Sequence, residues 1–402
     1  MITRAEPAFR CLRVVALRSR SGAYGGPADT ALNQAQLVCA TDYQVTLFST
    51  HLKSDEPQIT YRDGLEEISV RSRLLFKRLG FATLYSWKAP AEIWKQVGRT
   101  DIVHISFARE PIPILAAAIS LLLNRPLIVQ PHGMLTSASG FRQRILDRVA
   151  KPLYKRAAGV ISLTQDETRR LQRWQPRDPE SIYEIGNPPL SSSDDCNTTP
   201  SAALRKREAI FIARLEKRKR VVNFAAAALE SEKNSQEIGY RIVGPDQGEL
   251  SRLKPLLTMS DSLRYEGALP ARDIPQRLSE SSVFVLPSKE EPWGNVLVTA
   301  ISIGLPVVAT RSAALASEIE LQGAGIIVDD DNPSQISRAV EALLNSPERW
   351  LNTSKACKEM FRNQMSNETI EARLRNAYML VAKSGTRRSD SSRISPQTGG
   401  RR

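Results

Sequence analysis

The sequence predicts an α/β protein made of two doubly wound, Rossmann-like domains that face each other across a cleft. Short β-rich apolar runs alternate with helical stretches, which is typical of parallel sheets with helices on their faces. A polar, Pro- and Ser-rich break at residues 188–201 interrupts this alternation and is the expected interdomain linker. With 402 residues and 41% hydrophobic content, the chain is long enough for two full cores.

The N-terminal domain is expected to span residues 1–187. Its six expected strands are Leu12–Leu17, Gln44–Phe48, Ile102–Ile105, Leu127–Gln130, Gly159–Leu163 and Ile182–Ile185. Helical stretches such as Ala28–Ala40 and Gln165–Trp174 separate most of these strands. This order favours a parallel sheet, because a helix carries the chain back between neighbouring parallel strands.

The C-terminal domain is expected to span residues 202–362, followed by a helix within 363–384 and a disordered basic tail at 385–402. Its six expected strands are Ala209–Ala213, Tyr240–Val243, Ser262–Tyr265, Val283–Leu286, Pro306–Ala309 and Gly325–Val328. The expected late helices are Ser334–Leu344, Pro347–Arg362 and Glu368–Ala382. The apolar continuity of the strands suits a sheet that is buried on both faces.

Membrane-spanning and secretory segments are not predicted. A transmembrane helix needs about 18 consecutive apolar residues. The longest apolar run, Ile112–Leu123, is broken by Pro113 and Ser120. The first ten residues lack the apolar core of a signal peptide. The four cysteines match no metal or redox spacing, which favours a reduced, cytoplasmic setting.

The formal net charge is +13. Such an excess attracts phosphate-bearing partners, which include nucleotides, nucleic acid and anionic lipid, although it also serves solubility alone. The sequence has no aromatic-basic RNA motif and no recognition-helix motif. We therefore expect no nucleic-acid partner.

Ligand-binding residues in doubly wound folds follow the strands, so the loops at the strand ends are the places to search. After the first expected strand, Gly25 and Gly26 precede Pro27 and a helix. Glycine lets backbone amides approach a phosphate at a helix N-terminus, although a plain tight turn explains the pair equally well. The spacing is not the glycine pattern of nicotinamide enzymes.

The segment QPHGML directly follows another expected strand. His132 within it is one of three histidines in the chain. A lone histidine is usually structural, but this one lies beside Gly133 at a strand end. A histidine there can donate to a sugar hydroxyl or a phosphate.

The segment ARLEKRKR, residues 213–220, places five basic residues between a strand and a helix that begins near Val221. The helix dipole disfavours cations at this end, so their presence indicates a bound anion. Arg214 and Lys219 are the best candidates to hold a diphosphate, since Arg binds it in bidentate fashion and Lys acts as a point charge. The alternative is a solvated basic turn.

An acidic loop and a helix start lie within residues 287–310. Glu291 can accept hydrogen bonds from sugar hydroxyls, although helix capping is the structural alternative. The next backbone amides would point from the helix start towards phosphate or sugar oxygens; they belong to Trp293, Gly294 and Asn295.

Taken in order, these segments resemble the retaining family 4 (group 1) glycosyltransferases of the GT-B type. The similar segments are GAYGGPADTALNQAQLV at 22–38, DIVHISFARE at 101–110, QPHGML at 130–135, ARLEKRK at 213–219, VGPDQG at 243–248, and EEPWGN with GLPVVAT at 290–295 and 304–310. The resemblance covers nearly the whole chain. QPHGML is similar to a form seen in polysaccharide-building members, which implies a role in cell-surface polysaccharide synthesis.

The resemblance implies a nucleotide-sugar donor, bound mainly by the C-terminal domain, and a glycan or lipid-linked acceptor. Arg214 and Lys219 would neutralise the leaving diphosphate, and Glu291 would hold donor-sugar hydroxyls. The helix at 363–384 would return to the N-terminal domain. From that domain, His132 and the amides of Gly25 and Gly26 would complete the site.

The chain departs from the family pattern at three positions. Thr299 stands eight positions after Glu291, where the family has a second glutamate that holds the donor ribose. A threonine can still make one hydrogen bond there. Arg220 stands where the family prefers glycine, and Ala213 where it often has glycine.

No metal or other cofactor is expected. Asp329, Asp330 and Asp331 follow a strand and precede Asn332 and a helix, so a turn with a helix cap explains them better than a metal site. Arg214 and Lys219 could supply the charge that a metal would otherwise supply. We also find no second carboxylate for a covalent intermediate. Because the resemblance implies retention of the donor's anomeric configuration, the missing carboxylate favours a same-face displacement, in which the leaving phosphate accepts the acceptor's proton.

Three other functions stay open. A nucleotide-sugar epimerase of the same fold would need a donor and no acceptor. A non-catalytic sugar-nucleotide-binding protein is favoured by Thr299. A nicotinamide oxidoreductase is the weakest alternative, because neither half has the spaced glycines with a downstream acid.

Two segments of the N-terminal half predict docking on an anionic membrane, at the inner face of the cell membrane. In 139–156, apolar residues recur every four positions among basic ones; they are Phe141, Ile145, Val149 and Leu153. Residues 71–88 mix basic and large apolar side chains. The alternative is that the apolar stripe packs on the sheet and the basic residues form a solvated face.

Overall fold

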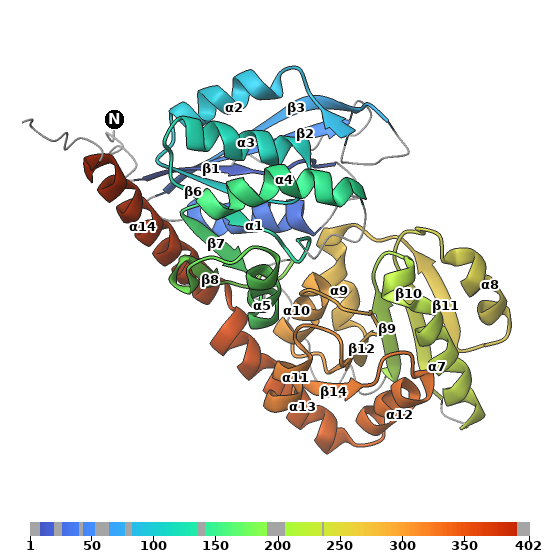
Figure 1. The fold of residues 1–402 in the computed structure, drawn as a ribbon. Helices are drawn as coiled ribbons and strands as arrows, with labels where there is room; N and C mark the ends of the chain where they lie inside the picture. Colours follow the sequence, from blue (N-terminus) through green and yellow to red (C-terminus); the bar gives the residue numbers. More distant parts are fainter. Residues whose placement is uncertain are drawn as a thin grey trace, which may run out of the picture. The chain divides into compact units, whose positions relative to one another are not determined.

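The computed structural model describes residues 9–19, 26–39, 43–52, 64–76, 83–135, 141–190, 206–234 and 237–391, and among these it leaves out the side chains of 141, 142 and 384–391. The chain divides into two compact units. Unit 1 comprises Met1–Ile185 and Glu371–Arg402, and unit 2 comprises Gly186–Ile370 (Figure 1). Within the described residues, no helix is long and apolar enough to cross a membrane.

Unit 1 is built on an eight-stranded sheet with the order β4-β3-β2-β1-β5-β6-β7-β8. The elements are β1 (Phe9–Val14), α1 (Pro27–Cys39), β2 (Tyr43–Leu52), β3 (Leu65–Leu74), β4 (Leu84–Tyr85), α2 (Ala89–Gly98), β5 (Ile102–Ser106), α3 (Pro111–Leu122), β6 (Leu127–Gln130), α4 (Phe141–Arg156), β7 (Gly159–Ser162), α5 (Gln165–Trp174), a 3-10 turn (Pro179–Ser181), β8 (Ile182–Glu184) and the greater part of α14 (Asn367–Ser391). All neighbouring strands pair in parallel except β3 and β4.

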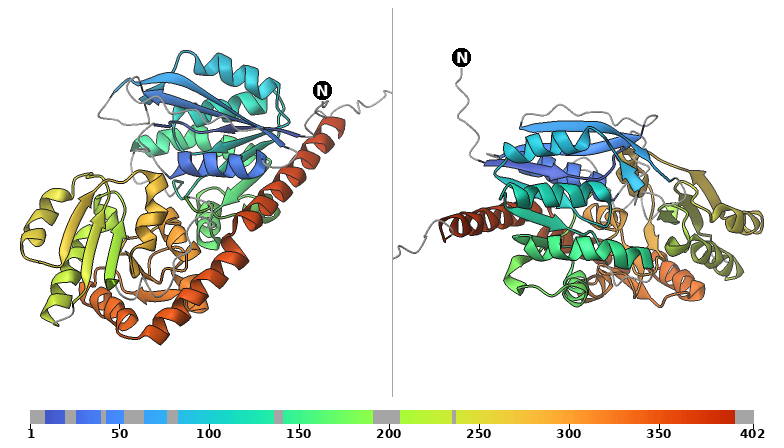
Figure 2. Two further views of the ribbon diagram at one scale, coloured as in Figure 1. Left: turned by 180° about the vertical axis from the view of Figure 1, so that it is seen from behind. Right: turned by 45° about the horizontal axis from the view of Figure 1, so that its top comes forward.

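The two faces of this sheet differ in polarity. Helices α2, α3 and α4 cover one face, where they pack on apolar strand residues such as Val14, Ile105 and Val129 (Figures 1 and 2). The other face, on the side of α1, holds buried polar side chains. Arg13 of β1 donates to the Tyr378 hydroxyl of α14 at 3.1 Å, and His104 Nδ1 lies 2.8 Å from the same oxygen. The C-terminal helix is therefore fixed to unit 1 by polar contacts.

Two strands of unit 1 were not expected from the sequence. Strand β3 has the sequence LEEISVRSRL, and most of its side chains are half-buried or exposed. It lacks the continuous apolar run of a central strand because only β4 lies between it and the edge of the sheet. Strand β4 pairs with it in antiparallel fashion, which ends the parallel order at that edge.

Unit 2 is built on a six-stranded, fully parallel sheet with the order β11-β10-β9-β12-β13-β14. The elements are β9 (Glu208–Ile212), a 3-10 turn (Lys217–Lys219), α7 (Val221–Lys233), β10 (Gly239–Val243), α8 (Leu250–Thr258), β11 (Leu263–Gly267), a 3-10 turn (Ala271–Asp273), α9 (Ile274–Ser279), β12 (Val283–Leu286), α10 (Asn295–Ser302), β13 (Val307–Thr310), α11 (Ala316–Gln322), β14 (Gly325–Val328), α12 (Pro333–Leu344), α13 (Pro347–Met360) and a π-helical turn (Phe361–Met365). Central strands β9, β12 and β13 are buried at every position, as their apolar runs predict.

The last helix runs further than expected. Helix α14 begins at Asn367 and continues to Ser391, past residue 384, where we expected the basic tail to begin. The boundary between the two units falls within it, between Ile370 and Glu371. The other boundary falls between Ile185 and Gly186. Residues 191–201 of the expected linker lie outside the described residues.

Candidate functional site

The basic loop of unit 2 connects the carboxyl end of β9 to α7. Its residues 217–219 form a 3-10 turn, and Arg220 precedes α7 in the left-handed conformation, with φ of 53°. The turn is tied to the acidic loop after β12, because the backbone N–H of Lys289 donates to the carbonyl of Arg218 at 2.9 Å. Two loops that are about 70 residues apart in the sequence thus meet at one edge of the sheet.

Glu291 lies at the centre of this contact and is 5% exposed. Its carboxylate accepts a hydrogen bond from the Lys219 ammonium and lies 3.7 Å from the Arg218 guanidinium. Burial raises the pKa of Glu291, but the charges of Lys219 and Arg218 outweigh burial and hold it below its ordinary value. Burial also lowers the pKa of Lys219, against the attraction of Glu291. Glu291 is therefore a carboxylate at neutral pH.

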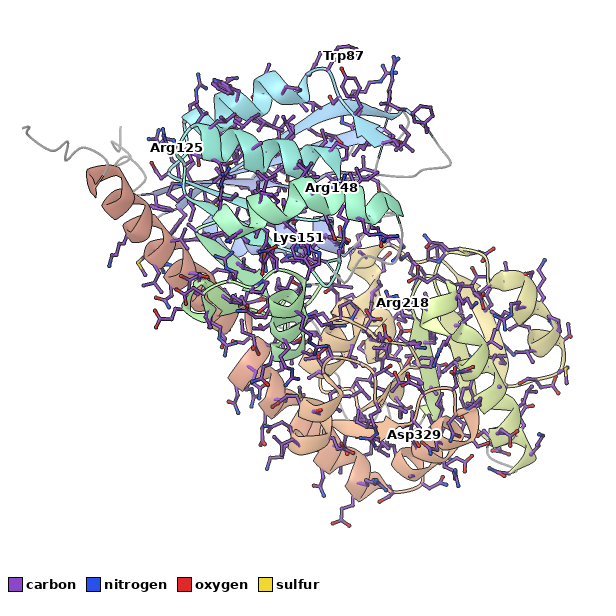
Figure 3. All side chains as sticks on the ribbon, viewed as in Figure 1. Trp87, Arg125, Arg148, Lys151, Arg218 and Asp329 are labelled. Atoms are coloured by element: carbon purple, nitrogen blue, oxygen red, sulfur yellow. The ribbon has the colours of Figure 1, made fainter. Side chains whose placement is uncertain are left out.

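The arginines of the loop are more accessible than the lysine. The Arg214 side chain is 46% exposed and Arg218 is 40% exposed, whereas Lys219 is 12% exposed. Arg214 contacts Glu216 at 3.6 Å and Gln247 at 3.3 Å. Arg218 is labelled in Figure 3. Both arginines can therefore reach an anion from solvent, while Lys219 acts from inside the loop.

The acidic run after β14, residues 329–331, forms ion pairs with Arg220. Arg220 forms an ion pair with Asp331 at 2.8 Å and lies 3.8 Å from Asp330. Helix α12 is capped by Asn332, whose side chain accepts from the backbone N–H of Gln335, so none of the three aspartates is the cap. In the part of the chain that the structure describes, no three His, Cys, Asp or Glu side chains gather as metal ligands would.

The N-terminus of α10 forms the other wall of the candidate site. Gly294 precedes this helix with φ of 81°, a conformation that disfavours other residues. The Trp293 ring is 7% exposed and packs so closely on Gly186 that a Cβ there would lie 2.1 Å from the ring. Trp293 is thus a buried support, whereas Gly294 shapes the turn after Glu291.

The side chain at position 299 already has partners within the chain. Thr299 is 1% exposed, accepts from the backbone N–H of Leu190 at 3.1 Å and donates to the carbonyl of Asn295 at 2.8 Å. The amide of Asn187 donates to the Asn295 side chain at 3.1 Å. Residues 187–190 therefore occupy the helix face on which a ribose-binding side chain was expected.

The candidate residues of unit 1 follow β1 and β6. Gly26 has φ of 55° and its carbonyl accepts from the first turn of α1, while Gly25 lies outside the described residues. His132 is 7% exposed and adopts φ of 53°, followed by Gly133 with φ of 75°. The ring Nε2 of His132 lies 3.1 Å from the Ser106 hydroxyl of β5.

Two family profiles together match most of the chain. A family profile for group 1 glycosyl transferases matches residues 199–364, and one for the glycosyl transferase 4-like domain matches residues 25–188. The chain belongs to the group 1 glycosyl transferases. It is an enzyme family of the GT-B fold, and the two parallel-sheet units have that architecture.

Individual relatives of this glycosyltransferase are distant. The α-D-kanosaminyltransferase of Streptomyces kanamyceticus is 25% identical over 57% of this chain, and the match spans 64% of that protein, which is less than two thirds. The D-inositol 3-phosphate glycosyltransferase of Arthrobacter sp. is 25% identical over 81% of this chain and 83% of its own. The structure of Anabaena HepE with UDP and glucose has a TM-score of 0.70 at 16% identity, over 92% of this chain and 98% of its own.

The glycosyltransferase has two supporting residues that sequence reasoning missed. Glu167 of α5 accepts from the backbone N–H of Gly133, and Ser106 contacts His132. The sequence offered one signal for Glu167, because Thr164 and Glu167 have the spacing of a helix capping box. Nothing in the local sequence links Ser106 to a residue 26 positions away.

Proposed function

We propose that this glycosyltransferase is a retaining, metal-independent enzyme that transfers a sugar from a nucleotide-diphosphate sugar to a glycan or lipid-linked acceptor, in cell-surface polysaccharide synthesis. The observation that carries this proposal is the basic loop of Arg214, Arg218 and Lys219 beside Glu291 and the start of α10. A loop with this charge at the carboxyl edge of a parallel sheet suits a diphosphate next to a sugar.

The donor class is supported by chemistry and by the relatives. Arg214 and Arg218 are exposed and can bind phosphate oxygens in bidentate fashion. The HepE structures hold UDP, and one holds UDP-glucose. A nucleotide-sugar donor is therefore the substrate class to test first.

The proposed reaction is a same-face displacement. Negative charge builds on the leaving diphosphate as its bond to the sugar breaks, and the arginines and Lys219 stabilise that charge without a metal. The leaving phosphate accepts the acceptor's proton as the new bond forms. Glu291, held ionised by Lys219, accepts hydrogen bonds from donor-sugar hydroxyls through its remaining lone pairs. His132 donates to the sugar or the phosphate.

The test is a binding and turnover screen with a panel of radiolabelled nucleotide sugars. We expect one donor to bind and to be consumed only when an acceptor is present. Conversion of the donor without an acceptor would instead identify an epimerase, and binding without turnover would identify a non-catalytic protein. Failure of every nucleotide sugar to bind would refute the proposed donor class.

We also propose that α4 of unit 1 docks on an anionic membrane, which supports a lipid-linked acceptor. Among the described side chains of α4, Asp147, Ala150 and Tyr154 are buried, and Leu153 at the end of the apolar stripe packs partly buried against the core, while the side chain of Phe141 lies outside the described part. The middle of the stripe faces solvent. Ile145 is 43% exposed and Val149 is 50% exposed. Exposed basic residues flank this stripe; they include Arg144 and Arg148. Arg148 is labelled in Figure 3.

The second segment presents exposed side chains of the same kinds. Leu75, Phe76 and Trp87 are 63%, 64% and 85% exposed, and Arg73 of β3 is also exposed. The residues 77–82 of this segment lie outside the described part. Apolar side chains among basic ones suit the interface of an anionic bilayer, where each basic residue contributes about 1 kcal/mol.

Sedimentation with vesicles tests the docking proposal. Wild-type protein should bind phosphatidylserine-containing vesicles at low salt and lose binding at high salt, because salt screens the attraction. Arg144→Glu together with Arg148→Glu should weaken binding. Arg338→Glu together with Arg349→Glu is the matched control, since both are exposed helical arginines of unit 2. Equal binding to neutral and anionic vesicles, or none to either, would refute the electrostatic proposal.

A further inference from the structure

We infer that Glu167 is a positioning residue for sugar transfer, because its carboxylate holds the left-handed turn that presents His132. The inference rests on the proposed function, in which His132 contacts the donor. Glu167 itself touches no reacting group in this arrangement. It acts through the backbone of the neighbouring loop.

The carboxylate of Glu167 joins two strand ends. One oxygen accepts from the backbone N–H of Gly133, after β6, and the other accepts from the backbone N–H of Leu163 at 2.7 Å, after β7. Glu167 is 2% exposed, so neither bond competes with bulk water. A buried carboxylate with one backbone donor on each oxygen is a rigid clamp, because charge-assisted hydrogen bonds are short and directional.

The turn that it holds is conformationally unfavourable. His132 has φ of 53°, a region that residues with a Cβ seldom adopt, and Gly133 continues with φ of 75°. Such a conformation persists only where the surroundings impose it. On the far side of the turn, Arg109 donates to the carbonyl of Met134 at 3.3 Å and is itself fixed by Asp147 at 2.6 Å.

Simple helix capping does not account for Glu167. Thr164 is the N-cap of α5, and its hydroxyl accepts from the backbone N–H of Glu167 at 3.2 Å. In a capping box the glutamate would reach back to the N–H of the cap residue itself. Here its side chain bonds to Leu163 and Gly133 instead. Thr164 caps the helix, and the Glu167 carboxylate holds the turn at His132 and Gly133.

The clamp also explains how His132 keeps one orientation. Its backbone is held through Gly133, and its ring Nε2 contacts the Ser106 hydroxyl at 3.1 Å. Ser106 is 4% exposed and lies on β5, so this contact is held by the sheet. A side chain fixed at both backbone and ring is pre-organised to bind a transition state.

The test compares Glu167→Gln with Asp166→Asn. Both remove one negative charge from the first turn of α5, and Asp166 is 44% exposed. A glutamine side chain has nearly the same volume as a glutamate, but its NH2 group would face one of the two backbone N–H donors. We expect Glu167→Gln to lower kcat at least tenfold with a smaller change in the donor KM, while Asp166→Asn stays within twofold of wild type.

A double-mutant cycle separates positioning from general damage. If Glu167 acts through His132, Glu167→Gln should cause no further loss of kcat in a His132→Ala background. An equal loss in both backgrounds would overturn the inference, as would kcat of Glu167→Gln equal to that of Asp166→Asn. An unchanged kcat in His132→Ala would instead refute the proposed role of His132.

Hydrogen exchange tests the clamp without any substrate. The Gly133 amide should exchange at least tenfold faster in Glu167→Gln than in wild type, with no change in Asp166→Asn. An unchanged Gly133 amide would overturn the inference whatever the donor screen shows. If Glu167→Gln does not fold, Glu167→Asp keeps the charge and is one methylene shorter, so it should show the same faster exchange of Gly133.

Discussion

Glu110 should make the stability of the glycosyltransferase depend on pH near neutrality. It precedes α3 at the carboxyl end of β5 and is half-buried, and burial raises its pKa from 4.5 to about 7. The α3 N-terminus offers it little help, because Pro111 and Pro113 lack N–H groups. Its side chain makes no capping bond to that helix. The carboxylate is therefore poorly stabilised where it lies.

The sign and size of the effect follow from linkage. The pKa of Glu110 is higher in the folded than in the unfolded chain, so its contribution is fully present below about pH 4.5 and is lost as the pH rises through about 7. At ~1.4 kcal/mol per pH unit, the loss is at most roughly 3 kcal/mol. Because Gln does not titrate, Glu110→Gln should unfold at a higher temperature than wild type at pH 8.5 and at the same temperature as wild type at pH 4.5.

The assay is thermal unfolding of both proteins between pH 4.5 and 8.5. For a chain of 402 residues, whose unfolding entropy is about 0.8 kcal/mol/K, roughly 3 kcal/mol corresponds to an increase of about 3–4 °C in Tm. Glu348→Gln is the control, since Glu348 lies in the first turn of α13 but is exposed. A difference between Glu110→Gln and wild type that is the same at pH 4.5 and 8.5 would refute the reasoning.

Three further predictions follow from the contacts. Arg214→Ala should cost about 2–4 kcal/mol of transition-state stabilisation in kcat/KM without changing Tm. Lys219→Ala should lower both kcat/KM and Tm, because it leaves the buried Glu291 carboxylate without its main partner. Equal Tm values for Arg214→Ala and Lys219→Ala would contradict this. Thr299→Val should cost about 1–3 kcal/mol in unfolding free energy by leaving the Leu190 N–H without its acceptor, and Thr299→Ser should not. Tyr378→Phe should cost a similar amount and speed amide exchange in α14 and β1, and unchanged exchange would contradict the anchoring role.

The strands of the fold could be predicted where burial leaves a continuous apolar run. Strands β9, β12 and β13 are buried at every position, and their sequences show it. Strand β3 could not be found in this way, because an almost peripheral strand mixes exposed and half-buried side chains. The sequence places its end in the segment 71–88, which mixes basic and large apolar side chains. Composition alone does not separate a strand near a sheet edge from a surface segment.

The loops of the site could be predicted, but their partners could not. Position after a strand and before a helix located His132, Arg214 and Glu291. The contacts that define their states join distant residues: Lys219 to Glu291 across 72 positions, and Gly133 to Glu167 across 34. Local spacing carries no information on such pairs, since they depend on which strands become neighbours in the sheet.

The contact between Arg220 and the acidic run is another pair of distant residues that local spacing does not reveal. In the sequence they are two separate anomalies, an arginine at a position where the family prefers glycine and three consecutive aspartates that resemble a metal motif. In the structure they explain each other. Arg220 adopts φ of 53°, which accounts for the preference for glycine, and its guanidinium pairs with Asp331 at 2.8 Å. Replacing Arg220 with glycine alone would relieve the backbone strain but would leave Asp330 and Asp331 without their cation, so the effect of the arginine depends on the acidic run.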